Sequence, residues 1–235
     1  GFTLHSYGVA GKRPKRHFQP DVVLSDFAEL RAHTFDQVWL CVSSPALRDG
    51  FIERLHQACI TASIWVTFQP RPTDRDYLVQ TAIPSDRLVT GMVNFIAYRA
   101  PLPGEDLGPE GVAYFIPPWS MTKFSGEDEL LVSAVALALQ RGHGALAGSV
   151  VPDAMVAALW AHGVLLPFAI ALESLHWSLH EMQNNQAVVD LVRNSVVDLQ
   201  IALEQQTGVP PGKWRYVQKP WFWTAALFAA PHATA

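Results

Sequence analysis

The chain has 235 residues, of which 49% are hydrophobic and only 16% charged, and this composition excludes a disordered or coiled-coil protein. Its 17 basic and 21 acidic residues give a net charge of −4, which is too small to indicate a nucleic-acid-binding protein. Two cysteines cannot build a disulfide framework, so we expect a reducing compartment, the cytoplasm.

The first half of the chain alternates short apolar runs with helical patterns. Residues 37–42 and 63–68 are continuous apolar runs, typical of buried strands. Between them, Ser44 is suited to cap a helix with Pro45 at its first position, and apolar residues recur every four positions over 47–59. A strand, a crossover helix and a second strand in this order predict a parallel sheet.

Two more strands are expected at residues 88–98 and 111–116, separated by a loop rich in proline and glycine. These strands complete an α/β domain that we assign to residues 1–124. The remaining residues, 125–235, show helical patterns only, and we assign them to an all-α domain.

Three helices are predicted in the second half. Ser125 followed by Asp128 approximates a capping box and opens a helix that Gly142 ends. A second helix starts at about Asp153, and a third carries apolar residues at steps of three and four over residues 189–203.

Residues 155–172 contain no formal charge, and their length approaches that of a membrane-spanning helix. His162 lies in the middle of this stretch, and no lysine or arginine lies near either end to set a topology. We therefore expect a buried helix of the all-α domain and no membrane partner.

This order of elements resembles the ketopantoate reductase (2-dehydropantoate 2-reductase-like) family, NADPH-dependent oxidoreductases with a 6-phosphogluconate-dehydrogenase-like C-terminal domain. The resemblance covers about residues 1–200, through the segments VWLCVSSPAL, TFQPR, DRLVTGMVNFIAYRAPLPG and VVPDAMVAALWAHGVLLP. It implies a Rossmann-type nucleotide-binding domain and NADP as cofactor. The family opens with a glycine-rich βαβ unit, and we expect that this first unit is missing from the present chain.

The resemblance also implies the cofactor-binding residues. After the strand at 37–42 the family usually places a lysine beside the cofactor, and here Ser43 stands there with Ser44 next to it. Where the family commonly has Gln-Asn-Gly, this chain has Gln69 followed by Pro70. Ser43, Ser44 and Gln69 are therefore the residues expected to bind the cofactor.

On the long helix the family pattern is a tryptophan, a lysine two residues later and an asparagine four beyond. Trp160 matches, but His162 replaces the lysine and Leu166 the asparagine. Reduction of a 2-keto acid needs a proton donor at the carbonyl oxygen, and an imidazolium is a competent donor near neutral pH. His162 is therefore the candidate catalytic residue, for a small 2-keto acid or related carbonyl compound.

Ketopantoate itself is an unexpected substrate, because Leu166 cannot orient a substrate as an amide does. Two alternatives stay open. In the first, His162 is an ordinary core histidine. In the second, the protein is a catalytically inactive relative of the family that acts as a binding or assembly module.

Other patterns bear on metals and assembly. Glu173, His176 and His180 share a helix face, but the second half of a di-metal motif is missing, so no metal site is expected. The helix at 189–203 and the aromatic residues of the tail between 214 and 223 offer more apolar surface than one small domain needs. We expect a homodimer formed through the C-terminal helical domain.

Overall fold

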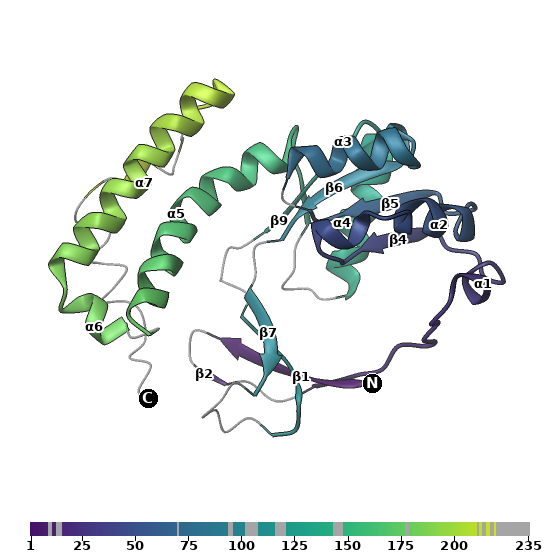
Figure 1. Cartoon of the computed structure of the whole chain (residues 1–235), viewed down its shortest axis with the longest axis horizontal. Coiled ribbons are helices and arrows are strands. Elements are labelled where there is room, and N and C mark those ends of the chain that lie inside the picture. Colours follow the sequence, from purple (N-terminus) through teal and green to yellow (C-terminus); the bar gives the residue numbers. More distant parts are fainter. Residues whose placement is uncertain are drawn as a thin grey trace. The chain divides into compact units, whose positions relative to one another are not determined.

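The computed structural model describes residues 1–8, 11–12, 16–69, 71–93, 96–101, 108–115, 121–142, 148–176 and 179–210, together with 212, 215–216 and 219. The chain divides into two compact units, Gly1–Met155 and Val156–Ala235. Strands and helices alternate in the first unit, whereas helices build the described part of the second (Figure 1). None of the helices in these ranges combines the length and hydrophobicity that a membrane span requires.

The first of two five-stranded sheets in the first unit has a parallel core. Its strand order is β10 (Gly148–Val150), β9 (Thr122–Ser125), β6 (Leu88–Met92), β5 (Ile64–Thr67) and β4 (Gln37–Leu40). Strands β4, β5 and β6 run parallel, β9 runs antiparallel to β6, and β10 is parallel to β9. The parallel pairing of β4 with β5 confirms the βαβ unit that the sequence predicts.

Strand β5 divides the core between the two faces of this sheet, because alternate side chains of a strand point to opposite faces. Trp65 packs with residues of η1 (Ser44–Leu47), α2 (Phe51–Ala58) and α3 (Pro72–Thr81). Val66 packs with residues of α4 on the other side. The sheet is therefore covered by helices on both faces, as a continuous apolar strand requires.

The segment between β4 and β5 forms two helices, and the single helix expected from Ser44 is wrong. A 3₁₀ helix ends at Leu47, and α2 begins at Phe51. Between them Asp49 and Gly50 adopt left-handed backbone conformations, with φ of 59° and 73°. Such residues cannot continue a right-handed helix, so the ladder of helical hydrogen bonds is interrupted there.

The second sheet also has five strands and combines parallel with antiparallel pairs. It contains β1 (Phe2–Gly8), β2 (Gly11–Lys12), β3 (Arg16–Phe18), β7 (Ile96–Ala100) and β8 (Gly111–Phe115), in the order β2-β1-β8-β7 with β3 also paired to β1. The single strand expected over residues 88–98 is wrong, because β6 ends in the first sheet and β7 begins in the second. An apolar run alone cannot reveal that its two halves pair with different partners.

Helix α4 (Glu129–Gly142) has a different N-terminal cap from the predicted one. The Asp128 carboxylate accepts hydrogen bonds from the backbone N–H of Leu130 at 2.8 Å and of Leu131 at 3.2 Å. Ser125 instead ends β9, and its Oγ accepts a hydrogen bond from the N–H of Ala154 at 2.9 Å. The capping box expected at Ser125 is therefore wrong, since that hydroxyl is engaged at the start of α5 (Ala154–Ser174).

Packing places α4 in the first unit. Val132 and Val135 of this helix are buried in one cluster with Val66 and Phe124 of the first sheet. The first unit consequently extends to Met155, beyond the boundary expected after residue 124.

The second unit contains most of α5, α6 (Leu179–Gln183) and α7 (Gln186–Thr207). Val192 and Val196 of α7 pack with Ala171 and Leu172 of α5, which confirms the apolar stripe predicted for the third helix. The expectation that the long helix is buried holds only in part, because Leu166 is 58% exposed.

Candidate functional site

The carboxyl ends of β4 and β5 bring three of the predicted site residues to one edge of the first sheet. Ser43 and Ser44 follow β4, and Gln69 follows β5. The two strands are parallel neighbours, so their carboxyl ends meet. In open parallel sheets, ligands bind at this edge.

Gln69 holds the loop that carries the two serines. Its Nε2 donates hydrogen bonds to the carbonyl oxygens of Val42 at 2.6 Å and Leu40 at 3.3 Å, and its Oε1 accepts one from the Thr67 hydroxyl. Two carbonyl acceptors require a donor, so Nε2 must face β4. Gln69 is only 4% exposed. Its amide is thus engaged inside the protein and fixes the backbone next to Ser43.

Ser43 remains available to a ligand. It is exposed, and although it occupies the position before η1, its side chain makes no capping hydrogen bond. Ser44, the first residue of η1, is half-buried. The sheet edge therefore presents one accessible hydroxyl on a backbone that Gln69 holds in place.

A charged pair joins the loop after β4 to helix α3 at the same edge. Arg48, just after η1, donates from Nη2 to Asp74 Oδ1 of α3 at 2.6 Å, and its guanidinium carbon lies 3.9 Å from the centre of the Tyr77 ring. Asp74 is 1% exposed. This pair links the loop after β4 to the helix after β5, and nothing in the spacing of residues 48 and 74 indicates it beforehand.

Nucleophilic cysteine chemistry does not fit this edge. Cys41 lies in the loop after β4 and Cys59 at the end of α2, and both are free. Burial raises the pKa of both thiols. Each is therefore protonated near neutral pH and a weak nucleophile.

The fourth predicted residue, His162, belongs to α5. Its side chain lies outside the described part of the structure, so its proposed role stays a prediction. Trp160, which matches the tryptophan of the family pattern, is buried, with 5% of its surface exposed. The residues described contain no group of His, Cys, Asp and Glu that could hold a metal ion.

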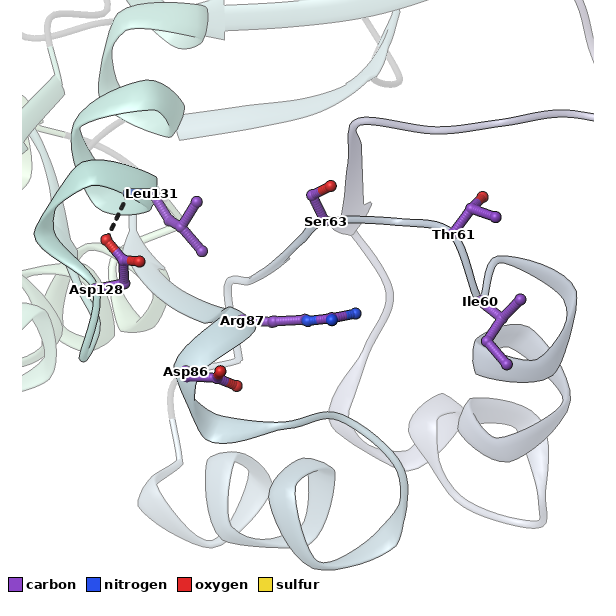
Figure 2. Close-up of a pocket in the computed structure, with 7 residues that line it drawn as sticks. All are labelled: Ile60, Thr61, Ser63, Asp86, Arg87, Asp128 and Leu131. Carbon is purple, nitrogen blue, oxygen red and sulfur yellow. Dashed lines mark hydrogen bonds between the residues drawn. The ribbon is translucent and has the colours of Figure 1, made fainter.

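A hollow of about 550 Å³ lies at the opposite edge of the sheet (Figure 2). Ser63 precedes β5, Asp86 and Arg87 precede β6, and Asp128 caps α4. The Arg87 side chain extends across this hollow, and the Asp128 carboxylate turns back to its own helix (Figure 2). Two carboxylates against one guanidinium make it unsuited to a cofactor that carries phosphates.

No protein-family model and no curated protein sequence matches the chain. Solved structures do match. The 2-dehydropantoate 2-reductase from Geobacter metallireducens GS-15 has a TM-score of 0.62 at 16% identity, over 98% of this chain and 75% of that one. The dimeric ketopantoate reductase from Staphylococcus aureus has a TM-score of 0.59 at 12% identity, over 97% of this chain and 76% of that one.

D-mandelate dehydrogenase in complex with NADH also matches, with a TM-score of 0.55 at 9% identity over 79% of this chain. The present chain spans 61% of that structure. At these identities the likeness concerns the fold. The chain has the fold of the ketopantoate reductases, a Rossmann-like domain followed by a helical one, as its sequence predicts.

Proposed function

We propose that the protein is a nicotinamide-dependent reductase that converts a small 2-keto acid or a related carbonyl compound to the corresponding alcohol. The observation that carries this proposal is the serine loop after β4, which Gln69 holds at the carboxyl edge of a parallel sheet. The fold it shares with ketopantoate reductases and D-mandelate dehydrogenase supports the same reaction class.

The residues of this chain fit one end of such a cofactor. Ser43 offers a free hydroxyl where the nicotinamide half would lie, with Ser44 beside it, and Gln69 contributes by positioning their backbone. The pyrophosphate half requires a glycine-rich turn between a strand and a helix. No Gly-x-Gly-x-x-Gly motif occurs in the 235 residues, so we expect these residues alone to bind NADPH weakly.

When bound, the cofactor supplies a hydride to the carbonyl carbon. The chain must then deliver a proton to the carbonyl oxygen, and we assign this step to the imidazolium of His162. Leu166, one helical turn later, offers no hydrogen bond to a polar substrate. Ketopantoate, with its hydroxyl group, is therefore not the proposed substrate.

A catalytically inactive relative that acts as a binding or assembly module is the second candidate. The substitutions that favour it are Ser43, His162 and Leu166, each at a position where the resemblance implies a functional lysine or asparagine. Both candidates are compatible with the fold.

Exposed apolar residues and free cysteines support proposals about the assembly and the location of the protein. Ile201 and Val209, at the C-terminal end of α7 and just beyond it, are 48% and 42% exposed, and a neighbour of the same fold is described as dimeric. We propose a homodimer through the C-terminal half. Val192 and Val196 do not contribute to its interface, because they are buried in the core of the second unit. The free cysteines favour the cytoplasm.

The cofactor proposal is tested by placing a negative charge on the serine loop. In protein expressed from the complete gene, Ser43→Asp should raise the Kd for NADPH at least tenfold, because the larger side chain would bring an unpaired carboxylate against the nicotinamide half, where cofactor binding would strip it of water. Ser133→Asp, on the exposed side of α4, is the matched control and should leave the Kd unchanged. NADH in a parallel titration gives the cofactor preference. Equal affinities of Ser43→Asp and wild type would remove this loop from the cofactor site.

A further inference from the structure

The segment that follows Ser43 is the short 3₁₀ helix η1, which is not part of a continuous helix. Asp49 and Gly50, directly after Arg48, adopt left-handed conformations that interrupt the helical hydrogen-bond ladder before α2. Within η1, the N–H of Arg48 donates to the carbonyl oxygen of Pro45 at 3.1 Å. The orientation of this segment therefore depends on contacts with other elements.

Three side chains hold the segment, each at a different point. Gln69 holds its beginning through the carbonyl oxygen of Val42. Leu47 is 0% exposed and is buried in the same core cluster as Leu78 of α3. Arg48 holds its end through an ion pair with α3. Apolar burial is not directional, whereas a hydrogen bond constrains both distance and angle, so we assign the orientation of the segment to Arg48 and the burial to Leu47.

Helix α3 offers the guanidinium of Arg48 two contacts on one face. Asp74 Oδ1 accepts a hydrogen bond from Nη2 at 2.6 Å, and the centre of the Tyr77 ring lies 3.9 Å from the guanidinium carbon. Asp74 and Tyr77 are three residues apart, so they are neighbours on the helix surface. A planar guanidinium that is bonded to a carboxylate and stacked on a ring has little freedom to rotate.

The ion pair has fewer partners than buried charges usually have. Asp74 is 1% exposed, and its Oδ2, like Arg48 Nη1, is buried without a hydrogen-bond partner among the described residues. A buried pair of this kind is weak evidence for a role in stability, and each unmatched polar atom calls for an explanation. The place of the pair supplies one, because it ends the segment that Ser43 begins, at the edge of the sheet where ligands bind.

We propose that Arg48 and Asp74 are positioning residues of the cofactor site, whose ion pair fixes the backbone of η1 so that the Ser43 hydroxyl is presented to the nicotinamide half. This inference rests on the proposed function and deepens it. The pair acts through the backbone of η1 and does not touch the cofactor. Ordering a loop at the moment of binding costs binding free energy, so a loosened pair weakens cofactor binding.

The test separates positioning from stability by removing the charges singly and together. Arg48→Met leaves the Asp74 carboxylate buried without its partner, and it should lower the melting temperature. Arg48→Met/Asp74→Leu removes both charges, and its melting temperature should return close to that of wild type. In protein expressed from the complete gene, this double variant should nevertheless keep a Kd for NADPH at least fivefold above that of wild type.

A second variant leaves the buried carboxylate paired. Arg48→Lys keeps a positive charge for Asp74 but cannot stack on Tyr77 as a planar group. It should keep the melting temperature of wild type and still raise the Kd for NADPH at least threefold.

Hydrogen exchange without cofactor reports on the segment itself. The amides of Ala46 and Arg48, which donate within η1, should exchange at least tenfold faster in the double variant than in wild type. The reason is that local opening of η1 no longer has to break the ion pair.

Arg75→Met is the matched control for Arg48→Met. Arg75 follows Asp74 in α3, is 36% exposed against 35% for Arg48, and pairs with Glu127 at 3.6 Å and not with η1. It should change neither the Kd nor the exchange of the two amides. A double variant with both the stability and the Kd of wild type would overturn the proposal, and so would unchanged exchange of the amides.

The two measurements also distinguish a failure of this inference from a failure of the proposed function. Wild-type protein that binds no NADPH, with faster exchange in the double variant, would contradict the proposed function and leave the pair a structural clamp only. Wild-type protein that binds NADPH, with a Kd and an exchange rate unchanged in every variant, would keep the proposed function and remove the positioning role.

Discussion

At the residue scale, Gln69 is the side chain on which the geometry of the candidate site depends. Gln69→Glu would place a carboxylate oxygen against the carbonyl oxygens of Leu40 and Val42, where the amide now donates. We expect a loss of about 2 kcal/mol in the free energy of unfolding at pH 7, because a buried acceptor is left without a donor. Urea denaturation measures this loss.

The same variant predicts a pH dependence with a definite sign. Burial against two carbonyl oxygens raises the pKa of a carboxylic acid in the folded state. The folded protein then holds the proton more tightly than the unfolded chain, so the loss should shrink as the pH falls toward 4 and grow as it rises. Gln80→Glu, on the exposed face of α3, should change stability by less than about 0.5 kcal/mol. A loss independent of pH would contradict the hydrogen-bond assignment.

The sequence predicted which residues reach this sheet edge but not how they are held. The family resemblance implied Ser43, Ser44 and Gln69, each of which lies within two residues of the end of an apolar run. The bond from Gln69 to Val42 spans 27 residues, and the Arg48–Asp74 pair spans 26. Such contacts depend on strand pairing in space, which the spacing of residues along the chain does not encode.

At the element scale, α4 shows that a helix can be predicted correctly while its cap is not. The Asp128 carboxylate accepts two N–H groups of the first turn. Asp128→Ala should therefore lower the free energy of unfolding by about 1 kcal/mol, the usual cost of losing such a cap. Thermal melting followed by circular dichroism reports the change.

Asp128→Asn is the control for this cap, because its side-chain oxygen still accepts the same hydrogen bonds. It should be close to wild type. If alanine and asparagine destabilised the helix equally, the loss would reflect charge and not capping. The sequence predicted Ser125 as the cap because a serine three residues before Asp128 approximates a capping box. In the structure Ser125 is the last residue of β9, and its hydroxyl accepts a hydrogen bond from the N–H of Ala154.

At the scale of the whole molecule, the order of helices and strands along the chain was predictable, but the division of the strands between two sheets was not. Continuous apolar runs separated by helical patterns predicted the parallel core of β4 and β5 and the helical second unit. The second sheet was not expected, because β1 pairs with β8 across more than one hundred residues of chain. The exposure of Leu166 and Ile170 on α5 was also not predicted, since a helix with apolar residues on nearly all sides gives no sign of which face remains exposed.

The proposed reductase depends above all on His162 as its proton donor. The most direct measurement is NADPH oxidation with a panel of small 2-keto acids, using protein from the complete gene, with wild type beside His162→Gln. Wild type should turn over at least one acid, and His162→Gln should lose that activity while keeping its melting temperature. His33→Gln, an exposed histidine of the first unit, should behave as wild type. Equal turnover in wild type and His162→Gln would contradict the role of His162, and no turnover by the folded wild-type protein with any acid would contradict the proposed reductase.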